Sequence, residues 1–249
     1  MTYPPADPAS PRAHRSTNVE ALFAQSSFGA ASLAAFEITS SHQDNTSLDP
    51  TVALEAEFEA EAALIAAASP LRRRHFLAGR ACAHSALAAL GVEHSGIGRH
   101  ESRAPLWPPD VIGAITHTDG YATAVVATDA TSSFGIGIDA EQIGRVDAAV
   151  AKRVMNAAER IAVANHATPE IAATALFCAK ESFYKAQWPH TQSWVGFEDV
   201  TVSFDADSTL VLHRATARTA LDGFLWPIVA RFAVIGDVAV GGLVASRLR

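Results

Sequence analysis

FGIGIDAE, at Phe134–Glu141, is the stretch from which the fold can be worked out. Large apolar residues alternate with small or acidic ones, which is the period of a β-strand. The three large apolar residues would therefore share one face. The opposite face would carry two glycines and two carboxylates, namely Gly135, Gly137, Asp139 and Glu141. We expect both carboxylates to project together from a face that the glycines leave uncluttered.

A second stretch, FCAKESFYKA at Phe177–Ala186, has the character of a helix, with no Gly or Pro to interrupt it. Glu181 and Lys185 are four residues apart and would lie on one face, and Lys180 directly precedes Glu181. Aromatic residues at neighbouring positions indicate a half-buried face. The alternative is an exposed ion pair, which would contribute little to stability.

Together these stretches predict a metal site. Mg²⁺ binds a few carboxylate oxygens and completes its shell with water and substrate phosphate. Asp139 and Glu141 on the strand and Glu181 on the helix could supply those oxygens, and the nearby lysines would then meet phosphate charge. A solvated strand end is the alternative for the D-x-E pair alone.

Two stretches nearer the N-terminus could bind an anion. His117 lies in THTDG, Thr116–Gly120, at the turn of a predicted hairpin. In RRRHFLAGR, Arg72 and Arg80 differ by about 80° around a helix, and long arginine side chains can still converge on one anion. The alternatives are a surface turn histidine and an ordinary charged helix face.

Helical patterns and antiparallel strand patterns occur in both halves of the chain, so the expected class is α+β. Residues 1–18 are rich in Pro, Ala, Ser and Thr, which predicts a disordered N-terminal extension. The polar tract TDATSS marks a junction between lobes at residues 19–130 and 131–249. The longest predicted helices span residues 54–68, 70–90, 148–165 and 169–187.

Composition excludes several classes of protein. The 249 residues carry a formal net charge of -7, so no global positive field favours nucleic acid, and any phosphate site must come from local clusters. The apolar segment 227–245 is broken by Arg231, Asp237 and glycines, which indicates a hairpin and no membrane span. With no secretory signal visible, a cytoplasmic protein is expected. Cys82 and Cys178 are expected to be buried free thiols.

Four stretches, taken in order, resemble the two-lobed group of 4'-phosphopantetheinyl transferases. They are RRRHFLAGRACAHSAL, APLWPPDVIGAITHTDGYATAVVA, GIGIDAE and FCAKESFYKA, and they cover roughly Arg72–Gln187. The combination of W-P, T-H, G-I-D-x-E and K-E-x-x-Y-K-A is highly specific. WVGFEDVTVSF and FCAKE give the chain the character of the mycobacterial and corynebacterial branch.

The resemblance implies two similar α/β lobes related by pseudo-twofold symmetry, with coenzyme A in the cleft between them. It implies transfer of the 4'-phosphopantetheine arm of coenzyme A to a serine of apo acyl or peptidyl carrier proteins, with release of 3',5'-ADP. Mg²⁺ or Mn²⁺ would be the cofactor, the enzyme would be of the holo-[acyl-carrier-protein] synthase type, and it would be a monomer that binds neither nucleic acid nor membrane.

The same resemblance assigns roles to residues. Asp139 and Glu141 match the metal-binding pair, and Glu181 matches a third ligand or the catalytic base. Lys180 and Lys185 match lysines that face the pyrophosphate. The positions matched to the phosphates of the nucleotide are Arg72, Arg80, Arg99, Thr116 and His117. Ala114 stands where many relatives carry a serine, so one hydroxyl contact to the nucleotide is expected to be missing.

A basic amphipathic stretch, GRVDAAVAKRVMNAAER, follows the metal strand and is the expected carrier-protein surface. Its basic residues are Arg145, Lys152, Arg153 and Arg160, interleaved with apolar Val146, Val150, Val154 and Met155. An ordinary amphipathic helix is the alternative for this stretch. For the whole protein, the alternatives are a non-catalytic coenzyme A-binding module and an unrelated Mg²⁺-dependent phosphotransferase.

Overall fold

The chain divides into two compact units. The first comprises Met1–Thr17 and Phe28–Ala130, and the second comprises Asn18–Ser27 and Thr131–Arg249. The computed structural model describes residues 13–24, 33–39, 54–55, 58–94, 96–129, 134–205 and 209–248. Segment 18–27 thus groups with the second unit, although the sequence predicts it in the first. Most of the predicted disordered extension lies outside the described residues, but its last part is ordered, because a strand forms at His14–Arg15.

The first unit is built on a four-stranded antiparallel sheet in the order β1-β2-β6-β5. Its strands are β1 (His14–Arg15), β2 (Leu33–Thr39), β5 (Val111–Thr118) and β6 (Tyr121–Thr128). β5 and β6 form the predicted hairpin, which turns at Gly120 with a φ of 74°. Two short strands, β3 (Gly98–Arg99) and β4 (Pro105–Leu106), pair beside it.

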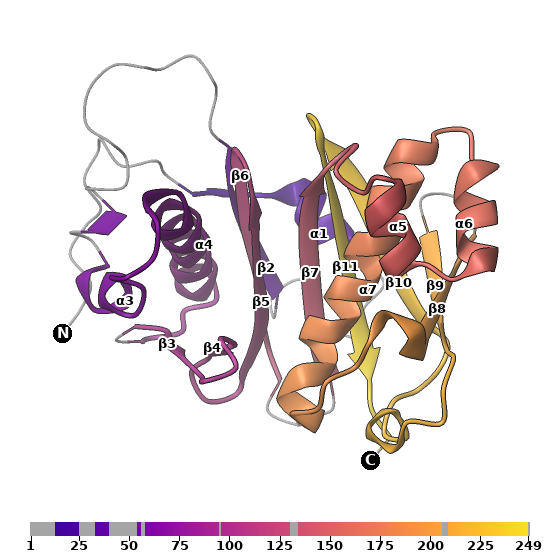
Figure 1. Ribbon diagram of the computed structural model, residues 1–249. Helices are drawn as coiled ribbons and strands as arrows, with labels where there is room; N and C mark the ends of the chain where they lie inside the picture. Colours follow the sequence, from indigo (N-terminus) through magenta and orange to yellow (C-terminus); the bar gives the residue numbers. More distant parts are fainter. Residues whose placement is uncertain are drawn as a thin grey trace. The chain divides into compact units, whose positions relative to one another are not determined.

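Helix α4 (Pro70–Ala89) packs along this sheet (Figure 1) and confirms the predicted helix there. Ser69 caps its start by accepting a hydrogen bond from the Arg72 backbone N–H at 3.4 Å, and Pro70 occupies the first turn. Leu77 and Leu87 are fully buried between helix and sheet. Of the helix predicted over 54–68, the described residues form helix at 54–55 and in α3 (Glu59–Ala63), and turns follow α3.

The second unit is built on a five-stranded antiparallel sheet in the order β7-β11-β10-β9-β8. Its strands are β7 (Phe134–Gln142), β8 (Val200–Phe204), β9 (Thr209–Arg214), β10 (Ile228–Ile235) and β11 (Val238–Ser246). The apolar segment near the C-terminus is therefore the predicted hairpin, turning at Gly236 with a φ of 61°. Among the described helices, none has the length and apolarity needed to cross a membrane.

Among the described residues, four α-helices belong wholly or mostly to this unit: α1 (Thr17–Ala21), α5 (Ala148–Val154), α6 (Ala157–Ala164) and α7 (Pro169–Thr191). The single helix predicted over 148–165 is wrong, because the chain is extended at Met155 and restarts at Asn156. Asn156 accepts a hydrogen bond from the Glu159 backbone, and the Glu159 carboxylate accepts one from the Asn156 backbone. This capping box satisfies the first N–H groups of α6 and begins a new helix.

Helix α7 lies directly on β7, backbone against backbone (Figure 1). A Cβ atom added to Gly137 would sit 1.8 Å from the Ser182 carbonyl oxygen, and one added to Gly135 would sit 2.1 Å from that of Ala186. The expectation of an uncluttered glycine face is therefore wrong, since α7 fills it. The α+β class itself is confirmed, as each unit combines an antiparallel sheet with a long helix.

Candidate functional site

Asp139 and Lys185 come together where β7 meets α7. The Lys185 ammonium donates hydrogen bonds to Asp139 Oδ1 at 2.8 Å and to the Ile138 carbonyl oxygen at 2.9 Å. Asp139 is buried and Lys185 is half-buried, so the pair is only partly screened by solvent. The glycine contact lets the helix approach closely enough for this ion pair to form.

Glu181 lies one helical turn before Lys185 on α7. Burial raises the pKa of the Glu181 carboxyl above its ordinary value, and the negative charge of Asp139 raises it further, while Lys185 opposes the shift. Charges affect a pKa in this way only at short range. The structure thus pairs Asp139 with Lys185 and places Glu181 one turn away on the same helix, while their joint role as a metal site stays a prediction.

Glu141 lies two residues beyond Asp139 on the same face of β7. Its Oε1 accepts a hydrogen bond from the Gln142 backbone N–H at 2.7 Å and lies 4.0 Å from the Arg145 guanidinium. The charges of Asp139, Glu141 and Lys185 also act on the Cys178 thiol. Burial raises the pKa of that thiol, Asp139 and Glu141 raise it further, and Lys185 acts in the opposite direction.

These carboxylates suit a hard cation by their chemistry. Mg²⁺ is commonly held by one or two carboxylates, with water and substrate phosphate completing its shell. In the part of the chain that the structure describes, no three His, Cys, Asp or Glu side chains are already gathered around one point, and the Lys185 ammonium is the cation beside Asp139. The repulsion between Asp139 and Glu181 is the kind that a bound cation relieves.

Lys180 has a different role from the one expected. Its ammonium donates to the Val154 carbonyl oxygen, the Phe197 carbonyl oxygen and Glu159 Oε2, at 3.0, 3.0 and 2.9 Å. An ammonium group has three N–H donors, so all of them are used. Lys180 and Glu159 are both buried. The prediction that Lys180 faces a pyrophosphate is wrong, and the residue instead ties α7 to α6 and to the chain at Phe197.

A pocket opens beside Glu181, which is itself part of the lining. Tyr184 and Phe183 of α7 line it together with Trp194, Val195 and Phe197 from the segment after the helix. The rings of Tyr184 and Trp194 lie 5.2 Å apart. This pocket was missed from the sequence. The aromatic residues of SWVGF were its only signal, and no helical or strand period connects them to α7.

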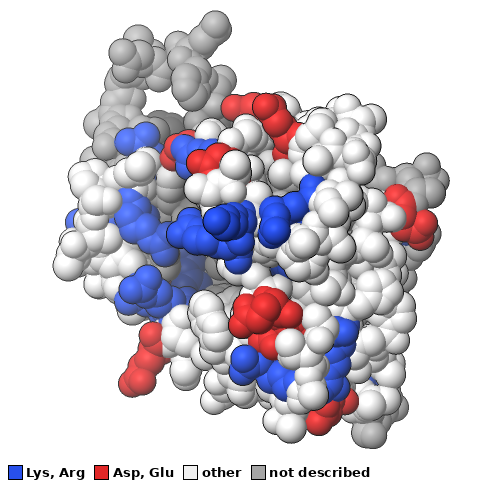
Figure 2. All heavy atoms as spheres, turned by 45° about the vertical axis from the view of Figure 1, so that its right-hand side comes forward, with Lys and Arg blue, Asp and Glu red and all other residues white. Residues whose placement is uncertain are grey.

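In the first unit, Arg72 and His117 come together from α4 and β5. Arg72 Nη1 donates to His117 Nε2 at 3.1 Å, and the ring of His75 lies 5.1 Å from that of His117. Arg72 is exposed and His117 is half-buried. Lys and Arg side chains gather into distinct groups on the surface that Figure 2 shows, despite the negative net charge. Local clusters therefore exist that could meet an anion.

Thr116 is not brought to the same place as His117. Its side chain is buried, and strand alternation points it to the opposite face of β5, which Ala114 shares. The Thr116 hydroxyl therefore does not lie beside the His117 ring, and its contact with the nucleotide stays a prediction. The Ala114 position lies on that same buried face, away from His117.

Arg80 is buried and engaged inside the first unit. Its Nη2 donates to the Gly98 carbonyl oxygen at 3.2 Å, and its Nε lies 3.7 Å from Glu61. Burial lowers the pKa of Arg80, Glu61 opposes this, and the positive charge of Arg99 lowers it further. Arg80 supports β3 from within and is not an exposed cation, and its expected contact with a nucleotide phosphate stays a prediction. Arg99 is exposed at β3, and its role stays a prediction.

The basic stretch after β7 is divided between surface and core. Lys152 and Arg153 are exposed at the end of α5, but Val154 and Met155 are buried in the core of the unit. They cannot supply the apolar contacts expected of a docking surface. Ile161 of α6, with 63% of its surface exposed, is an apolar side chain available there.

Two family models match the chain. The model for the 4'-phosphopantetheinyl transferase N-terminal domain matches residues 60–127, and that for the 4'-phosphopantetheinyl transferase superfamily matches residues 135–233. Together they cover most of both units.

Individual proteins are similar over much of their length. The 4'-phosphopantetheinyl transferase Npt of Nocardia iowensis is 41% identical over 59% of this chain and 66% of its own. The 4'-phosphopantetheinyl transferase PptT of Mycobacterium tuberculosis is 39% identical over 66% of this chain and 72% of its own. Among solved structures, the holo-[acyl-carrier-protein] synthase of Thermotoga maritima is similar with a TM-score of 0.39 and 22% identity, covering 46% of this chain and 64% of that one. On the family models and the curated relatives, the chain belongs to the 4'-phosphopantetheinyl transferase family.

Proposed function

We propose that the protein transfers the 4'-phosphopantetheine arm of coenzyme A to a serine of apo acyl or peptidyl carrier proteins. The observation that carries this proposal is the convergence of Asp139, Glu181 and Lys185 beside a pocket. In the reaction, the serine oxygen forms a bond to the β-phosphorus of coenzyme A. The bond from that phosphorus to the oxygen of 3',5'-ADP breaks, and the serine proton passes to a base.

Each of these side chains has a distinct task in the reaction. Glu181 accepts the serine proton as the general base, and it is placed for this task because it lines the pocket. Lys185 places positive charge against the reacting phosphate, held in position by Asp139. Asp139, Glu141 and Glu181 would hold Mg²⁺ or Mn²⁺, which supplies charge neutralisation for the pyrophosphate.

The pocket beside Glu181 is suited to the pantetheine arm. Its lining is mostly apolar and aromatic, with Tyr184, Trp194 and Phe197 among the contributors. The arm is a flexible chain of amides and methylenes, and such ligands are held by apolar walls and a few polar groups. Holding the arm there would keep the β-phosphorus of coenzyme A near Glu181. Reactants held in the right geometry react faster than reactants that must meet by diffusion.

The proposed reaction also implies an enzyme type, a class of partner, an oligomeric state and a cellular location. We place it in the holo-[acyl-carrier-protein] synthase type, with apo carrier proteins as partners and a monomer as the working unit. Lys152, Arg153 and Ile161 are the exposed residues of α5 and α6 that an acidic carrier could contact. Because coenzyme A is the donor, the reaction would take place in the cytoplasm.

Incubation with coenzyme A, Mg²⁺ and a panel of apo carrier proteins tests the proposal. At least one carrier should gain the mass of a phosphopantetheine group, with 3',5'-ADP released in equal amount. Carriers in which the modified serine is replaced by alanine are the control and should stay unchanged. Binding of coenzyme A without modification of any carrier would indicate the non-catalytic binding module instead.

The His117→Ala variant should raise KM for coenzyme A about tenfold with a smaller change in kcat, the effect of losing one hydrogen bond to a charged group. The reason is that His117 and Arg72 form one pair that would meet the 3'-phosphate. Steady-state kinetics with coenzyme A and 3'-dephospho-coenzyme A measure this. The dephospho form should largely remove the difference from the parent, and His100→Ala, at an exposed position, is the matched control. An equally large defect with both donors would show that His117 does not contact the 3'-phosphate.

A further inference from the structure

The segment from Ser193 to Val200 forms one side of the pocket beside Glu181, and we call it the wall segment. Trp194, Val195 and Phe197 line the pocket from it. Apart from a short 3-10 turn at Phe197–Asp199, it has no regular secondary structure before β8 begins at Val200. A segment of this kind needs other contacts to hold one shape.

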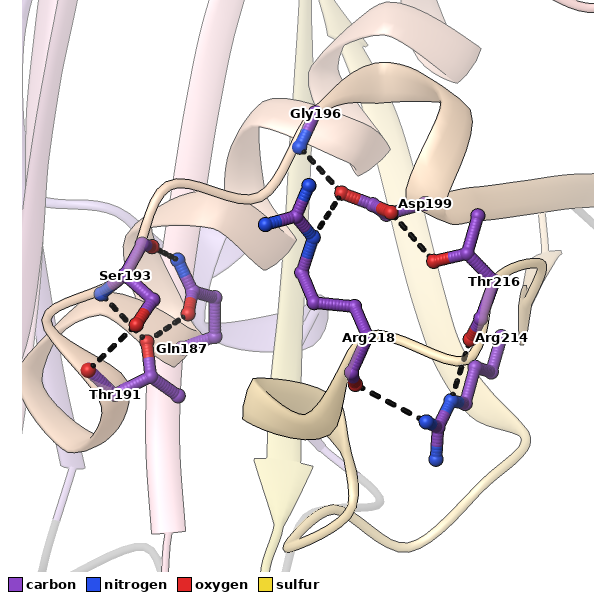
Figure 3. Close-up of polar contacts among 8 residues, drawn as sticks. All are labelled: Gln187, Thr191, Ser193, Gly196, Asp199, Arg214, Thr216 and Arg218. Carbon is purple, nitrogen blue, oxygen red and sulfur yellow. Dashed lines mark hydrogen bonds and ion pairs between the residues drawn. The ribbon is translucent and has the colours of Figure 1, made fainter.

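The first of these contacts lies at the start of the wall segment (Figure 3). Gln187 of α7 is fully buried, and its Nε2 donates to the Ser193 carbonyl oxygen at 3.2 Å. The Thr191 hydroxyl donates to Gln187 Oε1 and accepts from the Ser193 backbone N–H. Both polar ends of the Gln187 amide are thus used to fix where the chain leaves α7.

Asp199, near the end of the wall segment, makes the second contact by bonding back to Gly196 at its middle (Figure 3). Its Oδ2 accepts hydrogen bonds from the Gly196 backbone N–H at 2.9 Å and from Arg218 Nε at 2.7 Å. Its Oδ1 accepts one from the Thr216 hydroxyl. Burial acts to raise the pKa of the Asp199 carboxyl, but these hydrogen bonds outweigh it and hold the pKa below its ordinary value. The Asp199 carboxyl is therefore ionised at neutral pH.

Arg218 and Thr216 belong to the connection between β9 and β10, which is itself held in shape. Arg214 donates to the Thr216 carbonyl oxygen at 2.7 Å and to the Arg218 carbonyl oxygen at 3.0 Å, and it pairs with Asp222 at 2.6 Å. Figure 3 shows this connection beside the wall segment, with the Arg218 side chain reaching toward Asp199. Thr216 and Arg218, which follow Asp199 by 17 and 19 residues in the sequence, therefore hold the segment that lines the pocket.

We propose that Asp199, Thr216 and Arg218 are positioning residues, which keep the wall segment in the shape that receives the pantetheine arm before coenzyme A binds. This inference rests on the proposed function. Without the contacts of Asp199, Thr216 and Arg218, the wall segment would become ordered only when the pantetheine arm binds. The free-energy cost of that ordering would reduce the affinity for coenzyme A. None of the three residues lines the pocket, so their effect must pass through the backbone at Gly196.

A purely structural role for the cluster makes a different prediction. A general loss of stability would weaken the binding of every ligand to a similar degree. A loosened wall would instead affect only ligands that carry the pantetheine arm. Coenzyme A carries it and 3',5'-ADP does not, so the two ligands separate the two roles.

Binding of both ligands to Arg218→Ala and Thr216→Val, measured by calorimetry, tests the proposal. Arg218 is the lead position because its side chain is 39% exposed, and a thermal melt of the variant checks that it is folded. We expect each variant to bind coenzyme A about tenfold more weakly, the cost of ordering a few side chains on binding, with 3',5'-ADP affinity unchanged. KM for coenzyme A should rise more than kcat falls, and Arg218→Lys should recover part of the loss.

Arg231→Ala is the matched control, since Arg231 lies within β10, where it pairs in register with Thr209 and Gly242. It should bind both ligands as the parent does. The positioning role would be overturned if Arg218→Ala weakened the binding of both ligands equally, or if it bound coenzyme A as tightly as the parent does. The proposed function would still stand in either case, provided that the parent modifies carriers. A parent that modifies no carrier would overturn both.

Discussion

The Asp139→Asn variant should lower kcat for phosphopantetheine transfer at least about a hundredfold, the size of effect seen when one preorganised charge or donor at a reacting centre is removed. The amide keeps the size of the carboxylate but loses its charge. Lys185 then loses the ion pair that holds it at 2.8 Å, and a cation loses a ligand. Kinetics with a fixed apo carrier measure the effect, and circular dichroism with a thermal melt shows that the variant is folded.

Asp147→Asn is the matched control for this prediction. Asp147 caps α5 by accepting a hydrogen bond from the Val150 backbone N–H at 2.8 Å, and asparagine caps helices about as well as aspartate. The control makes the same chemical change in the same unit but away from Lys185. It should keep parental activity. If Asp139→Asn also transfers at a near-parental rate with Mg²⁺, the assignment of Asp139 to the reacting centre is wrong.

The Gly137→Ala variant should lose about 3 kcal/mol of the free energy of unfolding, the upper end of what overpacking commonly costs. The added methyl group would lie 1.8 Å from a backbone carbonyl oxygen of α7. A flexible side chain could turn away, but the helix backbone can move only as a whole. Urea denaturation measures the loss, and activity should fall with it, because α7 carries Glu181 and Lys185.

Gly223→Ala is the control that separates crowding from the general effect of replacing a glycine. Its Cβ would meet only the end of the Arg247 side chain, at 3.3 Å, and that side chain can shift. Its stability should therefore stay close to that of the parent. If Gly137→Ala were as stable as Gly223→Ala, the close contact between β7 and α7 would not exist in solution.

Much of the candidate site could be predicted because its signals are local. The alternation in FGIGIDAE predicts a strand with both carboxylates on one face, and the four-residue spacing of Glu181 and Lys185 places both on one face of a helix. The sequence also suggested that the two elements share a site, since their three carboxylates could hold one cation, and the ion pair of Asp139 with Lys185 shows that the strand and the helix do meet. Local periodicity alone could not have paired a strand with a helix about 40 residues away.

The errors share a cause, which is that burial depends on contacts far away in the sequence. Adjacent residues on a helix differ by about 100°, so Lys180 and Glu181 face different directions, and only the fold shows that Glu159 is the partner of Lys180. Arg80 likewise pairs with Glu61 and donates a hydrogen bond to the Gly98 carbonyl oxygen, and the sequence gives no sign of either contact. The break between α5 and α6 was readable, since Asn156 and Glu159 have the spacing of a capping box.

The contact between β7 and α7 also has a consequence for how the site tolerates change. Most helices are held on sheets by interlocking side chains, which can repack and let the helix slide by a fraction of a turn as sequences diverge. Here carbonyl oxygens rest where side chains would otherwise be, so the helix has no room to settle into a new register. The separation of Asp139 from Lys185 is thereby set by main-chain geometry. Residues elsewhere in the unit can therefore vary without changing the distance between Asp139 and Lys185.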